Sequence, residues 1–178
     1  MKTLVISGKS GSGKDAITQK LLERLNDKRI LVIHYGDLVK FYCKEFYNWN
    51  GQKDEAGRSL LQHLGTDTVR AKYPDYWAAA VAQFADAVRN DFDYCFIPDA
   101  RFPNEVEVTK KYLLDAKSIR INRFLPDGTP WKNPILTEKQ HQHPSETSLD
   151  DWKWFDYKMD YCDLDSLADY IMTYILED

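Results

Sequence analysis

The stretch GKSGSGKD at positions 8–15 follows directly on the apolar run LVIS at 4–7, and it decides the fold. The apolar run predicts a short buried strand, and 16–25, with its aliphatic residues on one face, predicts a helix. Glycines between them let the backbone turn sharply and point several N–H groups at one anion, next to the positive end of the helix dipole. The pattern therefore predicts a phosphate-binding loop whose Lys14 reaches the β- and γ-phosphates of ATP. The predicted ATP-binding residues are Gly8, Lys9, Ser10, Gly11, Ser12, Gly13, Lys14 and Asp15.

Asp15 stands where such a loop usually has a Ser or Thr whose hydroxyl binds magnesium. One interpretation is that the carboxylate takes over the magnesium side of the site, directly or through a water, because magnesium favours oxygen ligands. The other is that an acidic residue in the first helical turn stabilises the helix dipole. The sequence leaves both open.

Composition narrows the class of protein. A length of 178 residues fits one domain spanning 1–178, and a net charge of -4 provides no global field that would recruit nucleic acid. The three cysteines are odd in number and far apart, which favours reduced thiols in a cytoplasmic protein over a disulfide framework. No apolar run is long enough for a membrane span. We expect no nucleic-acid or membrane partner; helix-face packing is compatible with a homodimer, although no motif specifies one.

Strands and helices alternate along the chain, which predicts an α/β fold with a mainly parallel five-stranded sheet in three layers. The expected strands are 3–7, 30–33, 94–97, 118–121 and 157–159, with Pro98 and Asp99 closing the third. The expected helices are 16–25, 37–47, 58–72, 76–90, 104–114 and 164–176. The segment 124–149 has no clear periodicity and contains five prolines and glycines. A loop of that length in a compact domain is usually functional, so we expect a lid.

The residues after the third strand indicate transfer to an acceptor. An apolar strand of a hydrolytic P-loop ATPase often ends in Asp-Glu, where the Glu activates water, whereas here the run ends in Pro98, Asp99 and Ala100. Asp99 is a candidate to hold magnesium through water or to orient the acceptor. A kinase that joins two anions also needs several arginines. The candidates are Arg58, Arg70, Arg101, Arg120 and Arg123.

The ordered set of motifs resembles the deoxynucleoside monophosphate kinase family of P-loop kinases, the phage-type branch related to phosphomevalonate kinase. The matching pieces are GKSGSGKD at 8–15, GDLVK at 36–40, GRSLLQHLGTDTVR at 57–70, DARFPNE at 99–105 and HPSETSLD at 143–150. FDYKMDY at 155–161 matches more loosely. The GKD ending is typical of this group.

The resemblance implies ATP on the loop, with magnesium, and a nucleoside monophosphate in a facing cleft. It places Asp37 and Lys40 near the acceptor, with the pocket lined by Gln62, Thr66 and Arg70 and with Arg58 close by. Arg101 would bind the acceptor phosphate, and Glu105 would orient its turn. Arg120, Arg123, Ser145 and Glu146 would belong to the lid side. The predicted catalytic set is Lys14, Asp99, Arg101, Arg120 and Arg123, and the magnesium candidates are Asp15 and Asp99.

Several alternatives stay open. For Trp77, one is that it stacks on a nucleobase, and the other is that it belongs to the core. His141 and His143 form a weak metal-binding pattern, because no further ligands follow at metal-site spacing. The same arginines would serve another phosphorylated acceptor, such as phosphomevalonate or dephospho-coenzyme A. A nucleotide-binding regulatory protein without turnover and a kinase acting on nucleic-acid ends are further alternatives.

Overall fold

The computed structural model describes residues 1–177, which form an α/β fold around one sheet. Every strand pair in the sheet is parallel, and the spatial order is β2-β3-β1-β4-β5. The strands are β1 (Lys2–Ser7), β2 (Ile30–Val32), β3 (Tyr94–Ala100), β4 (Lys117–Arg123) and β5 (Tyr157–Tyr161). The α/β fold with a parallel five-stranded sheet is therefore confirmed.

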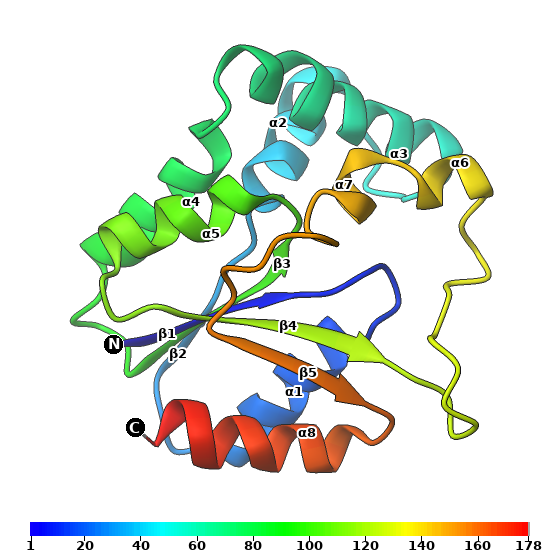
Figure 1. Ribbon diagram of the computed structural model, residues 1–178. Helices are drawn as coiled ribbons and strands as arrows, with labels where there is room; N and C mark the ends of the chain where they lie inside the picture. The colour runs from blue at the N-terminus through cyan, green and yellow to red at the C-terminus, as the bar shows by residue number, and fades with distance from the viewer. Residues whose placement is uncertain (178) are drawn as a thin grey trace.

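Helices cover both faces of the sheet, which gives the predicted three layers (Figure 1). Leu4 and Ile6 of β1 pack toward α1 (Lys14–Arg24) and α8 (Leu164–Ile171), whereas Val5 packs toward α4 (Tyr76–Ala87) and α5 (Pro103–Tyr112). Successive strand residues point to opposite faces, so a strand buried on both sides is apolar throughout. This explains why the strands read as continuous apolar runs.

The expected helix at 58–72 forms as α3 (Glu55–Gln62), continued by a wider π-helical segment, His63–Arg70. Asp54 caps α3, because its carboxylate accepts a hydrogen bond from the backbone N–H of Gly57. The neighbouring helix α2 (Asp37–Tyr47) matches its predicted range, and the closing helix runs through α8 into a π-helical turn, Met172–Leu176. Helices α2 and α3 and the π-helical segment His63–Arg70 form one wall of the cleft described below, whereas α8 packs with α1 on the other face of the sheet.

The prediction that Pro98 and Asp99 end the third strand is wrong, because β3 continues to Ala100. The pairing register between β1 and β3 shifts between Val5 and Ser7, so the strand contains an irregularity opposite this point. A bulge tolerates a proline, which has no N–H to donate to the ladder. The extension carries Asp99 and Ala100 beyond the apolar run, to the carboxyl edge of the sheet.

The segment 124–149, named the lid after its predicted role, leaves the sheet after β4 and contains two short helices, α6 (Glu138–His141) and α7 (Pro144–Thr147). Its opening and closing stay a prediction. The lid begins with a turn in which Leu125 and Thr129 are hydrogen-bonded, and it then runs to α6, which faces α3 across a surface cavity (Figure 1). Among residues 1–177, no helix combines the length and the apolar character that crossing a bilayer requires.

Candidate active site

The glycine-rich loop between β1 and α1 has the geometry of an anion cradle. Gly11 and Gly13 adopt the left-handed conformation, with φ of 74° and 82°, which side chains strongly disfavour. Tyr161 of β5 supports the loop by donating its hydroxyl to the carbonyl of Ser12. The hydroxyl of Ser12 is buried and has no protein partner within the described residues. An orphaned polar group and oriented backbone amides fit the binding of a polyphosphate.

Lys14 lies at the first position of α1 and is 8% exposed. Its ammonium donates to the carbonyls of Gly8 and Lys9, at 2.8 and 3.0 Å. Burial, followed by the nearby Arg101 cation, lowers the pKa of Lys14 to about 7. The amino group of Lys14 is therefore held inside the loop, where an incoming anion would favour its protonated, charged form.

The carboxyl end of β3 points two functional groups at the cleft. The carboxylate of Asp99 accepts backbone N–H bonds from Tyr35 (2.9 Å) and Gly36 (3.1 Å), which fixes the start of α2 against β3. Arg101 follows, and its guanidinium donates to Glu146 at 2.7 Å. The motif around 99–101 thus joins the sheet edge, α2 and the lid.

Glu105 organises the turn after β3 from a buried position, with 3% of its surface exposed. Its carboxylate accepts the backbone N–H groups of Arg101 (2.6 Å) and Phe102 (3.0 Å), and it pairs with the guanidinium of Arg70. Burial raises the pKa of Glu105 to about 7, and the Arg70 cation acts against that shift. The Arg70 guanidinium also stacks on the Phe102 ring, 4.0 Å from its centroid. Glu105 therefore holds the backbone of the turn at Arg101 and Phe102 and the side chain of Arg70.

One cavity of about 220 Å³ lies between α2, the π-helical segment and the end of β3. Thr66, Arg70 and Glu105 come together there with Lys40, Asp99 and Arg101. Apolar groups from Val39, Leu61 and Phe102 complete the wall. Predicted residues from distant parts of the sequence thus share one cavity.

A second cavity, of about 230 Å³, lies between α3 and the lid. Ser10 of the glycine-rich loop borders it, as do Arg58 and Gln62 of α3 and Ser145 and Glu146 of α7. Arg101 and Lys53 border both cavities. The two spaces therefore adjoin along these residues and Leu61, and the guanidinium of Arg101 also pairs with Glu146 of α7.

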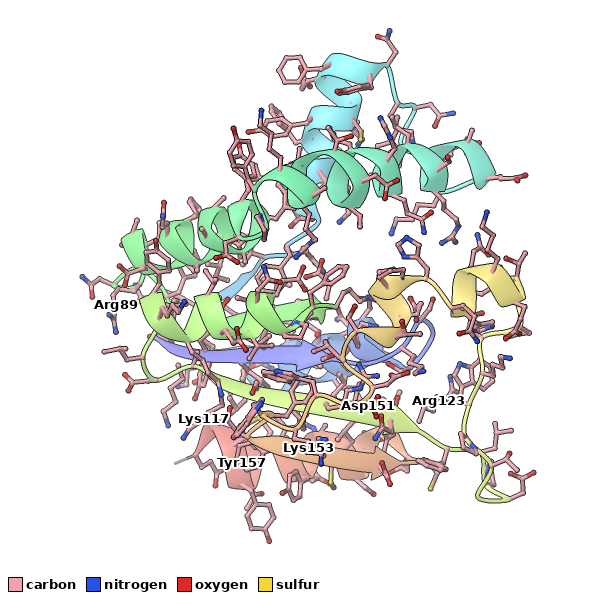
Figure 2. All side chains as sticks on the ribbon, turned by 45° about the horizontal axis from the view of Figure 1, so that its top comes forward. Arg89, Lys117, Arg123, Asp151, Lys153 and Tyr157 are labelled. Carbon is pink, nitrogen blue, oxygen red and sulfur yellow. The ribbon has the colours of Figure 1, made fainter. Side chains whose placement is uncertain are left out.

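The lid covers the loop directly. Asn133 donates to the Ser10 hydroxyl at 3.0 Å, and Trp131 lies against Gly11. Arg123 stacks on the Trp131 ring, 4.3 Å from its centroid, and its Nη1 reaches the Gly11 carbonyl at 3.5 Å. Figure 2 shows Arg123 and Lys117 at opposite ends of β4, with Arg123 on the loop side. Arg123 borders neither cavity.

Arg120 lies below the loop and also borders neither cavity. It is 7% exposed and donates to Ser7 and to Asp150, each at 3.0 Å. Asp150 in turn pairs with Lys9 at 2.7 Å. The guanidinium thus links β1, β4 and the end of the lid.

Three other predicted residues lie away from the cavities or inside the core. Asp37 pairs with Lys40 (2.7 Å) and borders neither cavity. Trp77 is 2% exposed and donates its indole N–H to the carbonyl of Gly65 at 2.9 Å, so most of its ring is core even though one edge reaches the cavity wall. Asp15 is exposed in the first turn of α1.

Magnesium has few candidate ligands. Within residues 1–177, no group of three or more His, Cys, Asp or Glu side chains gathers as a metal site. His141 contacts the Asn133 carbonyl, and His143 contacts the Ser145 hydroxyl. Magnesium on a nucleotide needs only one or two carboxylates, because it keeps several waters and the phosphates supply other oxygens. Asp15 and Asp99, which flank the loop and both add negative charge at Lys14, fit that limited role.

Sequence reasoning missed several residues of the site. Lys53 lies in a polar loop that carries no motif, and Asp150 ends a motif without an assigned role. Trp131 and Asn133 belong to the non-periodic segment. Phe102 directly follows Arg101 in the sequence, so the prediction for Arg101 could have been extended to it.

Comparisons with known proteins support the fold. No family model matches the chain, and no curated protein sequence matches it. An APS kinase from Mycobacterium tuberculosis aligns over 99% of this chain and 97% of its own, with a TM-score of 0.54 and 14% identity. A sugar kinase from Janibacter sp. HTCC2649 aligns over 98% and 94%, with a TM-score of 0.58 and 11% identity. A hexameric APS kinase from Thiobacillus denitrificans matches 99% of this chain but 29% of its own, with a TM-score of 0.51 and 13% identity. The chain has the fold of these kinases, which confirms the P-loop kinase fold; the finer family stays a prediction.

Proposed function

We propose that this chain transfers a phosphoryl group from ATP to a nucleoside monophosphate, preferably a deoxynucleotide, and so forms the diphosphate. The observation that carries the proposal is the position of Arg101. Its guanidinium borders the cavity at Ser10 of the loop and also the cavity at Thr66 and Arg70. A kinase needs one cation between its donor and acceptor sites, because charge spreads over the moving phosphoryl group.

On the donor side, Lys14 and the backbone amides of the loop would hold the β- and γ-phosphates of ATP. Asp15 and Asp99 would face the metal through water. Magnesium, when bound, neutralises donor phosphate charge and fixes its orientation.

On the acceptor side, Arg70 and Lys40 would bind the monophosphate, with Arg58, Gln62 and Lys53 along the entrance. An acceptor phosphate oxygen forms its bond to the γ-phosphorus while the bond to the leaving ADP breaks, so no covalent enzyme intermediate is needed. Arg101 would neutralise the transferred group, and the lid over Ser10 and Gly11 would exclude water. The homodimer stays a prediction.

The cations of the acceptor cavity favour an anionic acceptor over a neutral sugar. They do not choose between a nucleotide and another phosphorylated small molecule. The direct test is a panel in which ATP and magnesium are combined with each nucleoside and deoxynucleoside monophosphate, with APS, phosphomevalonate, dephospho-coenzyme A and a neutral sugar. We expect ADP and a nucleoside diphosphate from at least one monophosphate. Formation of product only from a different acceptor, or tight ATP binding without turnover of any acceptor, would overturn the proposal.

Variants assign the roles in the same assay. Lys14→Ala and Arg101→Ala should each lower kcat/KM about 100- to 1,000-fold, because each removes charge stabilisation of the transition state. The matched controls are Lys20→Ala, which removes an outer lysine of α1 that pairs with Asp165, and Arg89→Ala. Arg89 lies with Lys117 around a cavity at the amino end of the sheet (Figure 2). Both controls should keep normal turnover.

A further inference from the structure

The carboxylate of Glu146 bridges the glycine-rich loop and Arg101. One of its oxygens accepts the backbone N–H of Ser10 at 2.8 Å, and the other accepts the guanidinium of Arg101 at 2.7 Å. Its side chain is only 10% exposed. A lid residue 136 positions away from Ser10 in the sequence thus places a negative charge at the mouth of the cradle.

Backbone amides of a glycine-rich loop together with a guanidinium form the donor set that binds a phosphate oxygen pair. We propose that the Ser10 amide and Arg101 form one phosphate subsite, and that Glu146 fills it as a built-in anion which a substrate phosphate must displace. The binding part of this inference depends only on these contacts. Its part in turnover rests on the proposed function.

The other donors around the loop show which contacts must change. The ammonium of Lys14 donates to the carbonyls of Gly8 and Lys9, so its hydrogen bonds within the described residues go to backbone groups, and the carboxylate of Glu146 acts on it only through charge. Arg101 also donates toward the carbonyl of Ser145 at 3.4 Å, so α7 holds both the guanidinium and the amide of Ser10. A phosphate in the subsite therefore has to replace contacts made by α7.

The packing of α7 allows such a displacement. Helix α7 has no buried residue, whereas Leu149, just after it, is 3% exposed and Asp150 is anchored to the buried Arg120. The anchored residues keep the end of the lid attached to the sheet. Glu146 can leave the loop without unfolding that attachment.

The position of Glu146 also predicts coupling between the two substrates. Its two oxygens bind donors that differ in the cavities they border: Ser10 borders only the lid-side cavity, whereas Arg101 borders both. A phosphate that takes Arg101 on the acceptor side weakens the hold on Glu146 and so frees the Ser10 amide for the donor. Binding of either anion then favours the other.

The test uses inorganic tripolyphosphate with magnesium as the probe, titrated into the full chain by calorimetry without any acceptor. Glu146→Gln keeps the shape and removes the charge, and we expect tripolyphosphate to bind about tenfold more tightly, because a charge-assisted contact no longer competes. Glu138→Gln is the matched control, since it removes another lid carboxylate, one that pairs with Lys132 away from the loop. It should leave the affinity unchanged. Unchanged or weaker binding to a folded Glu146→Gln chain would overturn the inference.

A second measurement needs no variant. Hydrogen exchange of the wild-type chain, followed with and without tripolyphosphate, should show faster exchange at 143–147 and slower exchange at 8–14 when the anion binds. Slower exchange in both segments means that Glu146 stays in place, which would contradict displacement. Failure of the kinase proposal appears separately, as tripolyphosphate binding that behaves as expected while no acceptor in the panel is phosphorylated.

Discussion

Arg120 of β4 donates to the carboxylate of Asp150 at 3.0 Å, and this pair fastens the end of the lid to the sheet below the phosphate-binding loop. The other terminal nitrogen of the same guanidinium, Nη1, donates to the Ser7 hydroxyl at 3.0 Å. Since both terminal nitrogens of Arg120 donate to groups of the fold, its position indicates a structural role. Its predicted catalytic role stays a prediction.

The Arg120–Asp150 pair can be tested through stability. Asp150→Asn should lower the free energy of unfolding by about 1–3 kcal/mol, because it leaves a buried guanidinium short of a charged partner. Urea unfolding measures the change. Asp165→Asn is the control: this carboxylate also pairs with cations, but its side chain is 63% exposed, so its loss should cost less than about 1 kcal/mol. Equal losses in the two variants would show that the pair contributes no more than a surface contact.

Lys14 should take up a proton when the loop binds a polyphosphate. Its pKa in the free chain is lowered to about 7, mainly by burial. At about pH 8 most of the free ammonium is therefore deprotonated, whereas a bound polyphosphate favours the charged form and raises the pKa, so about one proton enters on binding. For the same reason the affinity should fall as the pH rises above about 7.

Calorimetry at one pH in two buffers of different ionisation enthalpy measures that proton. Lys14→Arg is the control variant, because a guanidinium stays charged throughout this range. It should bind polyphosphate without proton uptake. The assignment to Lys14 fails if the variant takes up the same proton as the wild type.

Gly13 and Gly128 form a matched pair for testing the loop. Their φ angles are 82° and 81°, so alanine meets similar backbone strain at both, about 1–2 kcal/mol. An added Cβ at Gly13 also collides with the hydroxyl of Tyr161, whereas at Gly128 it meets nothing within 4 Å. Gly13→Ala should therefore lose more stability and should weaken tripolyphosphate binding by at least about tenfold, while Gly128→Ala leaves binding unchanged. Thermal unfolding measures the loss of stability, and calorimetry measures tripolyphosphate binding. Similar losses of binding in the two variants would mean that backbone strain alone causes them.

Trp77 separates the two interpretations that the sequence left open. Trp77→Phe removes a buried ring edge and the indole donor to Gly65, so it should lower the free energy of unfolding by about 2–4 kcal/mol. The control, Tyr76→Phe, removes a hydroxyl that contacts Tyr42 on a residue with 42% exposure, and should change stability by less than about 1 kcal/mol. The second measurement is base preference, given by the ratio of the KM values for acceptors that differ only in their base. A changed base preference with unchanged stability would mean that Trp77 stacks on the acceptor.

Local chemistry explains how much of the site could be predicted. The phosphate-binding loop is defined by an apolar run, by the spacing of the glycines after it and by the lysine that follows. These features lie within a few residues of each other, so the sequence alone was enough to predict the loop. The role of Glu105 was only implied by the family resemblance, and in the structure its carboxylate accepts backbone N–H groups three and four residues away. The end of β3 was placed wrongly, because a proline that usually closes a strand lies here at a change of register.

The sequence by itself determined the order of strands and helices, the phosphate-binding loop and the polar residues at the end of the third strand, because these depend on periodicity and on backbone chemistry between near neighbours. Only the tertiary structure decided which partner each charged side chain has. Arg120 alternates with Ile119 and Ile121 along β4, so the pleat turns it away from the face that those residues pack against, and its carboxylate partner then comes from a lid that returns 30 residues later. Glu146 meets Ser10, and Glu105 meets Arg70, by the same folding of distant segments onto one sheet edge. Such pairings depend on chain topology and burial, which no local pattern records.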